Sequence, residues 1–513
     1  MRLKATSDVW WKNAVVYCVD VREFLHDLQG LTDRVDYLAG MGISCLWLMP
    51  FYPSPCRDGG YDITDFYGVD GRLGTPGDFA ELLRTCGDRG IRVIADLVVN
   101  HTSDEHRWFQ EGRDRESPYH DFYVWADEKP EEKAGDVVFP DKEKSNWRFD
   151  QKAKQWYLHR FYSFQPDLNV ANPQVRDEIA QVVGYWLEQG LAGFRVDAVP
   201  FLLEPMGMPK GALHDPHELL RDLRRFMGRR RGDAVLLGEV NLAPDQQRTF
   251  FGDEDGDELH MVLSFTVNQA MYLAFARSEA APLAKALEAL PEIPKDAQWA
   301  NFVRNHDELT LDKLSDAERE EVFAAFGPKK RHQLYGRGLR RRLPSMVDGD
   351  EDRLRLAYSL TFSLPGTPVL FYGEEVALRE DLDKPGRMSV RVPMDWDAVA
   401  RQRRDHESLL MWMERLIRRR RECPELGWGS ITLLDPGDPA VLAHRADWEG
   451  STVLAVHSLA DVPRTVEIDC EHPLVDLFDD DELPSEDGRV AVPLGRYGGR
   501  WFRVRRPGAM LAP

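Results

Sequence analysis

An arginine and a carboxylate stand two residues apart in the apolar segment 193–199, GFRVDAV. A short apolar run of this kind predicts a strand buried on both faces. Side chains at positions i and i+2 of a strand point to the same side, so Arg195 and Asp197 should face one space. There the cation would hold the carboxylate ionised. A structural ion pair at the end of a buried strand would have the same sequence.

Similar chemistry follows three other apolar runs of the chain. In order, the polar residues at these ends are Asp96 with Asn100 and His101, then Arg195 with Asp197, then Glu239, and then His306 with Asp307. Parallel strands of a barrel bring their carboxyl ends to one mouth, where active sites lie. The ordered set therefore predicts one active site that contains carboxylates, histidines and an arginine.

Paired carboxylates with no metal-binding cluster beside them indicate glycoside chemistry. Asp197, next to Arg195, suits a nucleophile. Glu239 follows the apolar run AVLLG, so partial burial should raise its pKa toward that of a general acid. Asp307 would bind sugar hydroxyls as the oxocarbenium ion forms. The two histidines would donate to the same hydroxyls, or they are buried histidines with structural partners.

The elements that must position these residues alternate between short apolar runs and helical patterns over some 420 residues. This rhythm is typical of βα units around a parallel sheet, and eight runs favour a closed (β/α)8 TIM barrel. The predicted strands are 15–21, 45–49, 92–98, 193–199, 234–240, 259–266, 299–303 and 368–372. Helical spacing marks the segments 31–38, 79–86, 175–188, 218–227 and 408–421.

Two departures from the alternation predict two further domains. The segment 102–167 is rich in aromatic and turn residues and is too long for a simple connection, so we expect an inserted domain over the barrel mouth. From residue 427 to 513 the runs have period two, as in an antiparallel β-sandwich. The barrel would then comprise 1–101 and 168–426. The arginine runs 340–342 and 418–421 are expected to lie on solvated helix surface.

Composition excludes several classes of partner. The net charge of −21 argues against nucleic acid and against an anionic membrane surface. The sequence contains no apolar run long enough to span a membrane and no signal-peptide core. Six cysteines without a CxxC pair suggest reduced thiols in a cytoplasmic protein. No zinc-ligand spacing or phosphate-binding glycine loop is found.

The motifs DLVVNHTS, GFRVDAV, GEVN and RNHDE, with QPDLN, resemble the signature regions of the α-amylase family, glycoside hydrolase family 13. The resemblance covers essentially the whole chain. It implies a barrel with a domain inserted after the third strand and a C-terminal β-sandwich. It also implies that Asp197 is the nucleophile, Glu239 the acid/base and Asp307 the transition-state stabiliser. Arg195, His101 and His306 become substrate-site residues, and Asp96 a structural or electrostatic member of the site.

Longer segments, such as FYPSPCRDGGYDITD and HRFYSFQPDLN, are most similar to the trehalose synthases of that family, which interconvert maltose and trehalose. By this resemblance Arg391 and Asp62 close the pocket behind one glucose, with Tyr61 as the platform for its ring. A structural salt bridge between the first two would look identical. Gln165 and Phe164 belong to the same substrate site, although Phe164 replaces the histidine that usually precedes QPDLN.

The resemblance also implies a structural calcium ion, while catalysis would need no cofactor. Its ligands would be Asn100, Asp167 and Glu204, with main-chain oxygens near Phe201 and Leu202. Alternatively, Asn100 and Asp167 fix the inserted domain by hydrogen bonds alone. The first βα loop, 22–30, lacks the longer calcium loop of trehalose synthases, and the loop 377–388 is shortened.

The sequence therefore favours a retaining α-glucosyl enzyme acting on maltose, trehalose or a related α-glucoside. The nearest alternative is an α-glucosidase or glucosyltransferase, in which water or another acceptor enters. A third reading is a catalytically silent family member that serves as a binding scaffold, but the three catalytic carboxylates speak against it. A homo-oligomer stays possible on the sequence.

Overall fold

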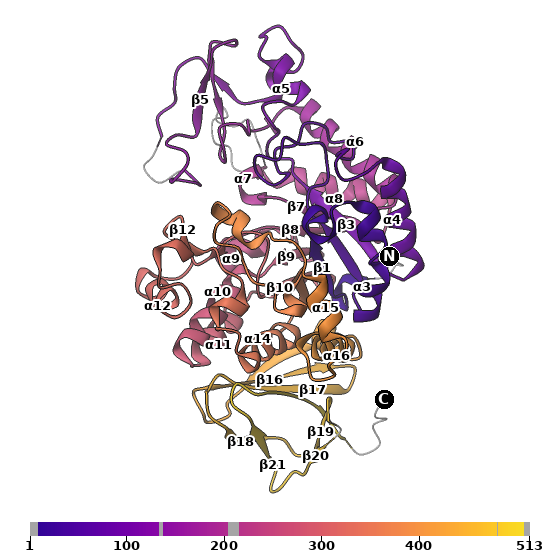
Figure 1. Cartoon of the computed structure of the whole chain (residues 1–513), viewed down its shortest axis with the longest axis vertical. Coiled ribbons are helices and arrows are strands. Elements are labelled where there is room, and N and C mark those ends of the chain that lie inside the picture. Colours follow the sequence, from indigo (N-terminus) through magenta and orange to yellow (C-terminus); the bar gives the residue numbers. More distant parts are fainter. Residues whose placement is uncertain (1–8, 133–136, 204–214, 480, 507–513) are drawn as a thin grey trace.

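The computed structural model describes residues 9–132, 137–203, 215–479 and 481–506. Its centre is a closed barrel of eight parallel strands in the order β1-β14-β10-β9-β8-β7-β3-β2, which confirms the predicted fold class (Figure 1). The barrel strands are β1 Val16–Val19, β2 Cys45–Leu48, β3 Arg92–Leu97, β7 Gly193–Val196, β8 Val235–Gly238, β9 Met261–Leu263, β10 Gln298–Phe302 and β14 Thr367–Phe371. All are buried except at the first residue of β3.

The helices of the barrel surround this sheet. The larger ones are α3 Val35–Met41, α4 Pro76–Asp88, α6 Pro173–Gln189, α8 Glu218–Arg230, α10 Phe265–Arg277, α11 Ala281–Glu288, α12 Asp316–Phe326, α14 Glu351–Ser363, α15 Trp396–Gln402 and α16 Leu409–Arg421. Helix α4 begins at a capping box of Thr75 and Asp78, with proline at its first position. Among the helices that the structure describes, none is both long and apolar enough to cross a lipid bilayer.

Shorter helices and hairpins occupy the loops. They are α1 Val21–Leu25, α2 Leu28–Thr32, α7 Val199–Leu203, α9 Pro244–Thr249, α13 Leu343–Met346, α17 Glu425–Trp428 and the small sheet of β11 Leu309–Thr310, β12 Gln333–Leu334 and β13 Gly338–Leu339. Several predicted strands were too long. The run 259–266 contains the three-residue β9 and the start of α10, because an apolar run continues from a buried strand into a buried helix without a change of composition.

The predicted insertion contains a sheet in the order β4-β6-β5, formed by Trp125–Ala126, Gln155–Leu158 and Trp147–Asp150 respectively. Helix α5, Arg107–Gly112, belongs to the same lobe, and its Phe109 ring stacks on Trp125 with 5.5 Å between the ring centroids. In Figure 1 this lobe stands at the top, above the carboxyl ends of the barrel strands. Its aromatic residues thus pack against one another over the mouth.

The C-terminal part contains a six-stranded antiparallel sheet and a two-stranded sheet, at the bottom of Figure 1. The first has the order β15-β16-β17-β22-β19-β20, and the second pairs β18 with β21. The strands are β15 Ser430–Leu434, β16 Val441–Trp448, β17 Ser451–Ser458, β18 Arg464–Asp469, β19 Leu474–Asp476, β20 Glu482–Leu483, β21 Arg489–Leu494 and β22 Gly499–Val504. Apolar side chains from both sheets share one core cluster, as the predicted sandwich requires.

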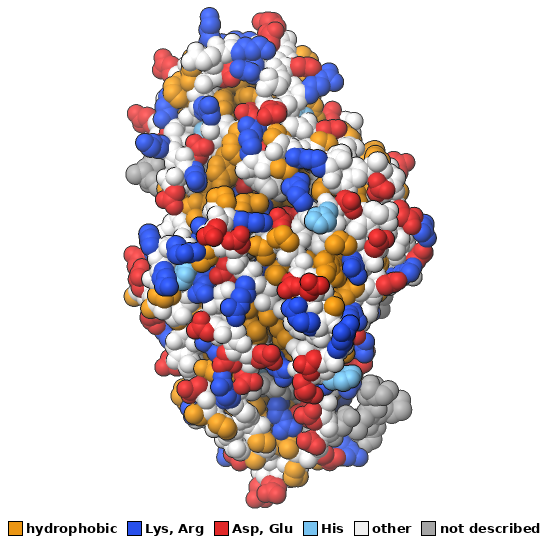
Figure 2. All heavy atoms as spheres, in the orientation of Figure 1, with side chains coloured by type: hydrophobic (Ala, Val, Ile, Leu, Met, Phe, Trp, Pro, Cys, Tyr) orange, Lys and Arg blue, Asp and Glu red, His pale blue; other side chains and the backbone are white. Residues whose placement is uncertain are grey.

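The two arginine runs match the expectation of solvated helix surface only in part: Arg418 and Arg421 of α16 are exposed, whereas residues 340–342 precede α13 and are buried or half-buried. Arg342 is 2% exposed and Arg420 is 1% exposed, and each donates to backbone carbonyls. The charged side chains visible in Figure 2 have both signs and are interspersed over that face of the molecule. Buried arginines in a charge run cannot be distinguished from exposed ones by composition, because their partners are carbonyl groups of distant segments.

Candidate active site

Arg195 lies at the centre of the site and joins three carboxylates. It faces inward from β7, where parallel pairing sets it directly beside Asp96 of β3. Its Nη1 donates to Asp96 and, at 2.6 Å, to Asp197, while Nη2 donates to Glu239 at 2.6 Å. The guanidinium side chain is 1% exposed. One buried cation therefore fixes the two predicted catalytic carboxylates relative to each other.

The turn after β7 carries Asp197 to the mouth of the barrel. The strand ends at Val196, and Ala198 has φ +49°, a conformation that non-glycine residues rarely adopt and that often occurs at functional sites. This turn points the backbone N–H of Ala198 at Glu239, which accepts its hydrogen bond at 3.2 Å. The backbone strain thus serves to bring the acid and the nucleophile together.

The pKa values of both carboxyl groups are raised. Burial raises the pKa of Asp197 to about 6, whereas Arg195 favours the ionised form as expected but does not outweigh burial. Burial raises the pKa of Glu239 to about 7, again against Arg195 and with a further contribution from Asp197. Between about pH 6 and pH 7 the pair can hold one proton, as one acid and one nucleophile require.

Asp307 follows β10 and lies against two arginines and a histidine. Arg387 donates to its Oδ1 at 2.9 Å and Arg391 at 2.8 Å, and His306 Nε2 lies 3.2 Å from its Oδ2. Burial alone would raise the pKa of Asp307, but Arg387, His306 and Arg391 outweigh it and hold the pKa well below its usual range. Asp307 is therefore a permanent anion in the cavity, unlike Asp197 and Glu239.

The predicted pairing of Asp62 with Arg391 is not what the structure shows. Asp62 is fully buried and accepts hydrogen bonds from Ser54 and Arg57, away from the cavity. Arg391 instead donates to Asp307 and to the carbonyl of His306. It packs against Gly59, where a Cβ would lie 2.1 Å from its Nη1.

The acidic residue that lines the cavity from this loop is Asp58, which the sequence analysis did not single out. Arg387 Nη2 donates to both of its carboxylate oxygens at 3.0 Å. Asp58 and Arg387 each stand four residues before a predicted member, Asp62 and Arg391. The sequence therefore contains two aspartates and two arginines that could line the cavity, and only the fold shows that Asp58 and Arg387 do so.

The remaining predicted substrate residues lie around the pair formed by Asp58 and Arg387. Tyr61 lines the cavity and stacks on His306 with 5.7 Å between the ring centroids. The Tyr61 hydroxyl oxygen lies 2.7 Å from His306 Nε2. His101 also lines the cavity, and Gln165 donates to Asp58 at 3.1 Å. Phe164 does not line it. Its ring stacks on Tyr162 and lies 4.4 Å from the guanidinium carbon of Arg57, so direct contact with a sugar is not supported.

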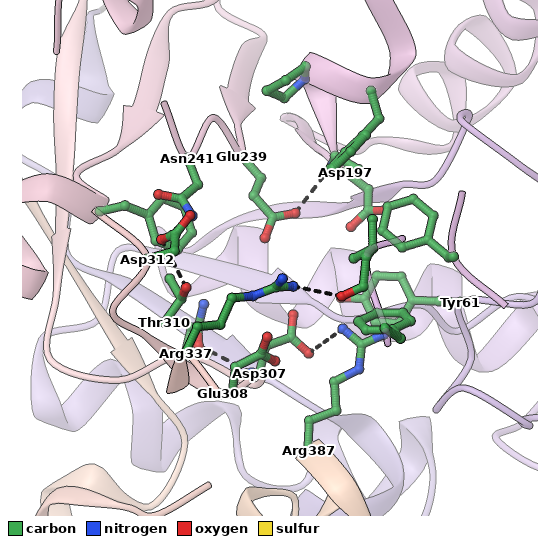
Figure 3. A pocket seen from close by; sticks show the side chains of 18 of the residues that line it. Tyr61, Asp197, Glu239, Asn241, Asp307, Glu308, Thr310, Asp312, Arg337 and Arg387 are labelled. Atoms are coloured by element: carbon green, nitrogen blue, oxygen red, sulfur yellow. Dashed lines mark hydrogen bonds and ion pairs between the residues drawn. The ribbon is translucent and has the colours of Figure 1, made fainter. Parts of the chain in front are cut away.

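These groups face a cavity of about 610 Å³, a size typical of small-molecule sites. In Figure 3 Tyr61, Asp197 and Arg387 lie on one side and Asn241, Thr310 and Asp312 on the other. Asn241 and Thr310 both donate to Asp312. The inserted lobe reaches the loop after the seventh barrel strand through Arg337, which donates to the carbonyl of Val138 at 2.8 Å. Residues of the inserted lobe and of the barrel loops thus both line the cavity, which stays partly open to solvent.

The predicted calcium ligands surround an arginine. Arg160 is 3% exposed; its Nε lies 3.3 Å from Asp167 Oδ2, and its Nη1 donates to the carbonyl of Phe201. Asn100 hydrogen-bonds to Asp167, and Leu202 lies in the same short helix as Phe201. Glu204 lies outside the described residues. Because the guanidinium occupies the oxygen acceptors, an ion does not fit between them as they stand, and calcium stays a prediction.

Two experiments distinguish whether a calcium ion or Arg160 links the inserted lobe to the barrel. If Arg160 joins the inserted domain to the barrel, EDTA should leave the melting temperature unchanged, and Arg160→Met should lower it by about 5 °C or more because it leaves Asp167 unpaired. The matched control is Arg107→Met, which removes an exposed arginine of the same lobe and should change little. A melting temperature that falls on addition of EDTA and recovers on addition of calcium would show that an ion makes the link.

Comparison with known proteins agrees with this geometry. A family model described as the alpha-amylase catalytic domain matches residues 12–323, and one described as a sucrose hydrolase-like C-terminal domain matches residues 450–503. The trehalose synthase/amylase of Mycobacterium tuberculosis is 38% identical over 96% of this chain and 90% of its own length. A trehalose synthase of Pimelobacter sp. is 36% identical over 97% and 96%. The solved alpha-amylase from H. orenii has a TM-score of 0.79 at 24% identity, covering 96% of this chain and 100% of its own, which shows the shared fold.

Proposed function

Because the chain belongs to the α-amylase family, glycoside hydrolase family 13, and is a glycosidase or transglycosidase, we propose that it interconverts maltose and trehalose by a retaining mechanism. The observation that carries the mechanism is that Asp197 and Glu239 bind the two terminal nitrogens of one guanidinium. This favours the short separation of retaining enzymes, about 5–5.5 Å, over the wider one of inverting enzymes. The relatives named trehalose synthase support the choice of substrates.

In the first step Asp197 attacks the anomeric carbon of the glucosyl unit. The bond to the leaving oxygen breaks as Glu239 gives that oxygen its proton, and a β-glucosyl ester on Asp197 forms with release of glucose. Asp307, a permanent anion, and Arg387 with Asp58 would hold the hydroxyls of the glucosyl unit. Positive charge that develops on the sugar is then stabilised by the nearby carboxylates.

In the second step the released glucose turns within the cavity. Glu239, now a carboxylate, takes the proton of the anomeric hydroxyl, and that oxygen attacks the anomeric carbon of the ester and frees Asp197. The product is trehalose, with the α-configuration kept by two inversions. If water attacks instead, the products are two glucose molecules. The contact between Arg337 and Val138 joins the inserted lobe to a barrel loop over part of the cavity, and such a cover supports return of glucose because it limits the entry of water.

The charges of the cavity favour a neutral disaccharide. Its cationic side chains already have partners: Lys313 pairs with Asp312, Arg387 with Asp58 and Asp307, and Arg337 with a carbonyl. A phosphorylated sugar would therefore meet no free arginine or lysine among the described lining residues. Six carboxyl groups line the same cavity, and those that are ionised would repel it: Asp58, Asp197, Glu239, Asp307, Glu308 and Asp312.

Product analysis tests the proposal. The protein is incubated separately with maltose, trehalose and trehalose 6-phosphate, with isotopically labelled glucose in the buffer. We expect each neutral disaccharide to yield the other without incorporated label, and the phosphate to stay intact. Glucose as sole product would assign a hydrolase, and labelled disaccharide would assign a transferase with an open acceptor site.

The pH dependence of kcat/KM for maltose should be a narrow bell. Asp197 must be ionised, so activity falls as the pH drops below about 6, and Glu239 must be protonated, so activity falls as the pH rises above about 7. The measurement is kcat/KM between about pH 4 and pH 9 at constant ionic strength, with the folded state checked at each end of that range. A profile without an acid or an alkaline limb would contradict this assignment of acid and nucleophile.

A further inference from the structure

The arginine run 340–342 makes most of its hydrogen bonds to the loop 380–391 after the eighth barrel strand, although Arg341 also donates to the carbonyls of Phe326 and Ser345. Arg340 Nη2 donates to the carbonyls of Leu382, at 2.9 Å, and of Lys384. The carbonyl of Arg340 accepts from the hydroxyl of Ser389 at 3.0 Å. The carboxylate of Glu380, in the same loop, accepts from Arg341 Nε at 3.1 Å and from the backbone N–H of Arg342 at 3.0 Å. The loop is thus held at both of its ends.

Arg342 makes the most buried of these contacts. Its Nε donates to the carbonyl of Val390 and its Nη1 to the carbonyl of Tyr372, both at 2.8 Å. The guanidinium lies over the rings of Phe371, at 4.4 Å, and Tyr372, at 5.0 Å. A planar fork that binds two carbonyls and stacks on rings is a geometry that lysine cannot reproduce. Arg342 therefore joins the end of β14 to the residue directly before Arg391.

The loop held in this way delivers two arginines to the cavity. Arg387 and Arg391 both bind Asp307 Oδ1, and Arg387 also binds both oxygens of Asp58. In Figure 3 Arg387 extends from its ribbon toward Asp307. The positions of the two carboxylates that would hold the glucosyl unit thus depend on where residues 386–391 lie. Displacements of about 1 Å at such a site can cost about 10²-fold in rate.

We propose that Arg342 is a positioning residue of the active site, which acts through the carbonyl of Val390 on Arg387 and Arg391 and through them on Asp58 and Asp307. Arg340 and Arg341 assist it at the other end of the loop. Arg342 is buried and is not among the residues that line the cavity. The inference rests on the proposed function only for the choice of substrate, since any glucosyl transfer or hydrolysis at this site would need the same carboxylates.

The test compares Arg342→Lys with Arg420→Lys, a matched control. Arg420 is equally buried and also caps carbonyls, of Gly366 at 2.7 Å and Cys423 at 3.3 Å. Gly366 precedes β14, at the amino end of the barrel, where residues contribute to stability rather than to catalysis. Both variants should melt at lower temperature than the parent. Consumption of maltose, whatever the product, is measured at a temperature well below both transitions.

We expect Arg342→Lys to lower kcat/KM for maltose consumption by about 10- to 100-fold, with an increase in KM as well as a decrease in kcat. The acid limb of the pH profile of kcat/KM should move to higher pH in this variant, because a displaced Arg387 stabilises the Asp197 carboxylate less. Arg420→Lys should leave KM, kcat and the pH profile within about twofold of the parent. Equal losses in both variants, or parental kinetics in Arg342→Lys, would overturn the proposal.

A milder variant covers the case in which Arg342→Lys does not fold. Arg340→Gln removes the guanidinium that binds Leu382 and Lys384, at a half-buried position, and should lower kcat/KM about threefold or more with the same shift of the acid limb. Parental kinetics in Arg340→Gln would then overturn the proposal. If the unmodified enzyme yields glucose alone, the proposed isomerisation is wrong. The variants still test the role of Arg342, because the rate of maltose consumption is measured whatever the product.

Discussion

Asp197→Asn should abolish turnover of maltose and trehalose, with a loss in kcat on the order of 10⁴-fold or more. The amide is nearly the same size as the carboxylate but cannot form the glucosyl ester. Its amide oxygen can still accept from Arg195, but the ion pair that Asp197 makes with this guanidinium at 2.6 Å is lost. Because the buried carboxyl group has a pKa of about 6, replacing it with a neutral amide should cost little folding free energy at lower pH.

The measurement is the initial rate of disaccharide consumption, with the melting temperature recorded for the same sample. Asp476→Asn is the matched control, since Asp476 is 1% exposed and pairs with Arg500 in the C-terminal sheet, far from the cavity. That variant should lose stability and keep its rate. Residual turnover within about tenfold of the parent in Asp197→Asn would show that another residue is the nucleophile.

Periodicity and strand-end chemistry predicted the barrel and the three carboxylates because both are local properties. A strand buried on both faces is apolar throughout, so a charge in such a run, as at Arg195 or Asp197, stands out in the sequence. The order of the strands around a closed barrel then follows the order of the chain.

The pairings within the site could not be predicted in the same way, because they join segments far apart in the sequence. Asp58 and Arg387 are 329 positions apart, and neither lies in an apolar run. Arg160 is 41 positions from Phe201, whose carbonyl it binds. Backbone carbonyls are present at every residue, so no sequence pattern indicates which of them will accept from a buried guanidinium. The balance between burial and Arg195 at Asp197 likewise depends on distances.

Glu239→Gln should separate the two roles of the acid/base residue. The glutamine side chain keeps an oxygen that can accept from Ala198 and Arg195, so the fold of the turn should survive, but it has no acidic proton to give. For maltose, whose leaving group is a sugar hydroxyl that must be protonated, kcat should fall about 10²- to 10⁴-fold. For α-glucosyl fluoride, whose leaving group departs as an anion, formation of the glucosyl-enzyme should proceed at a rate close to that of the parent.

The second step then becomes limiting in the Glu239→Gln variant, because its amide cannot take the proton of the entering glucose or water, and the ester on Asp197 should accumulate. Mass spectrometry of the intact variant after α-glucosyl fluoride is added should show one added glucosyl unit, and peptide mapping should place it on Asp197. The alkaline limb of the pH profile, near pH 7 in the parent, should vanish in the variant. A variant that loses both substrates equally, or one that keeps the alkaline limb, would assign the acid to a residue other than Glu239.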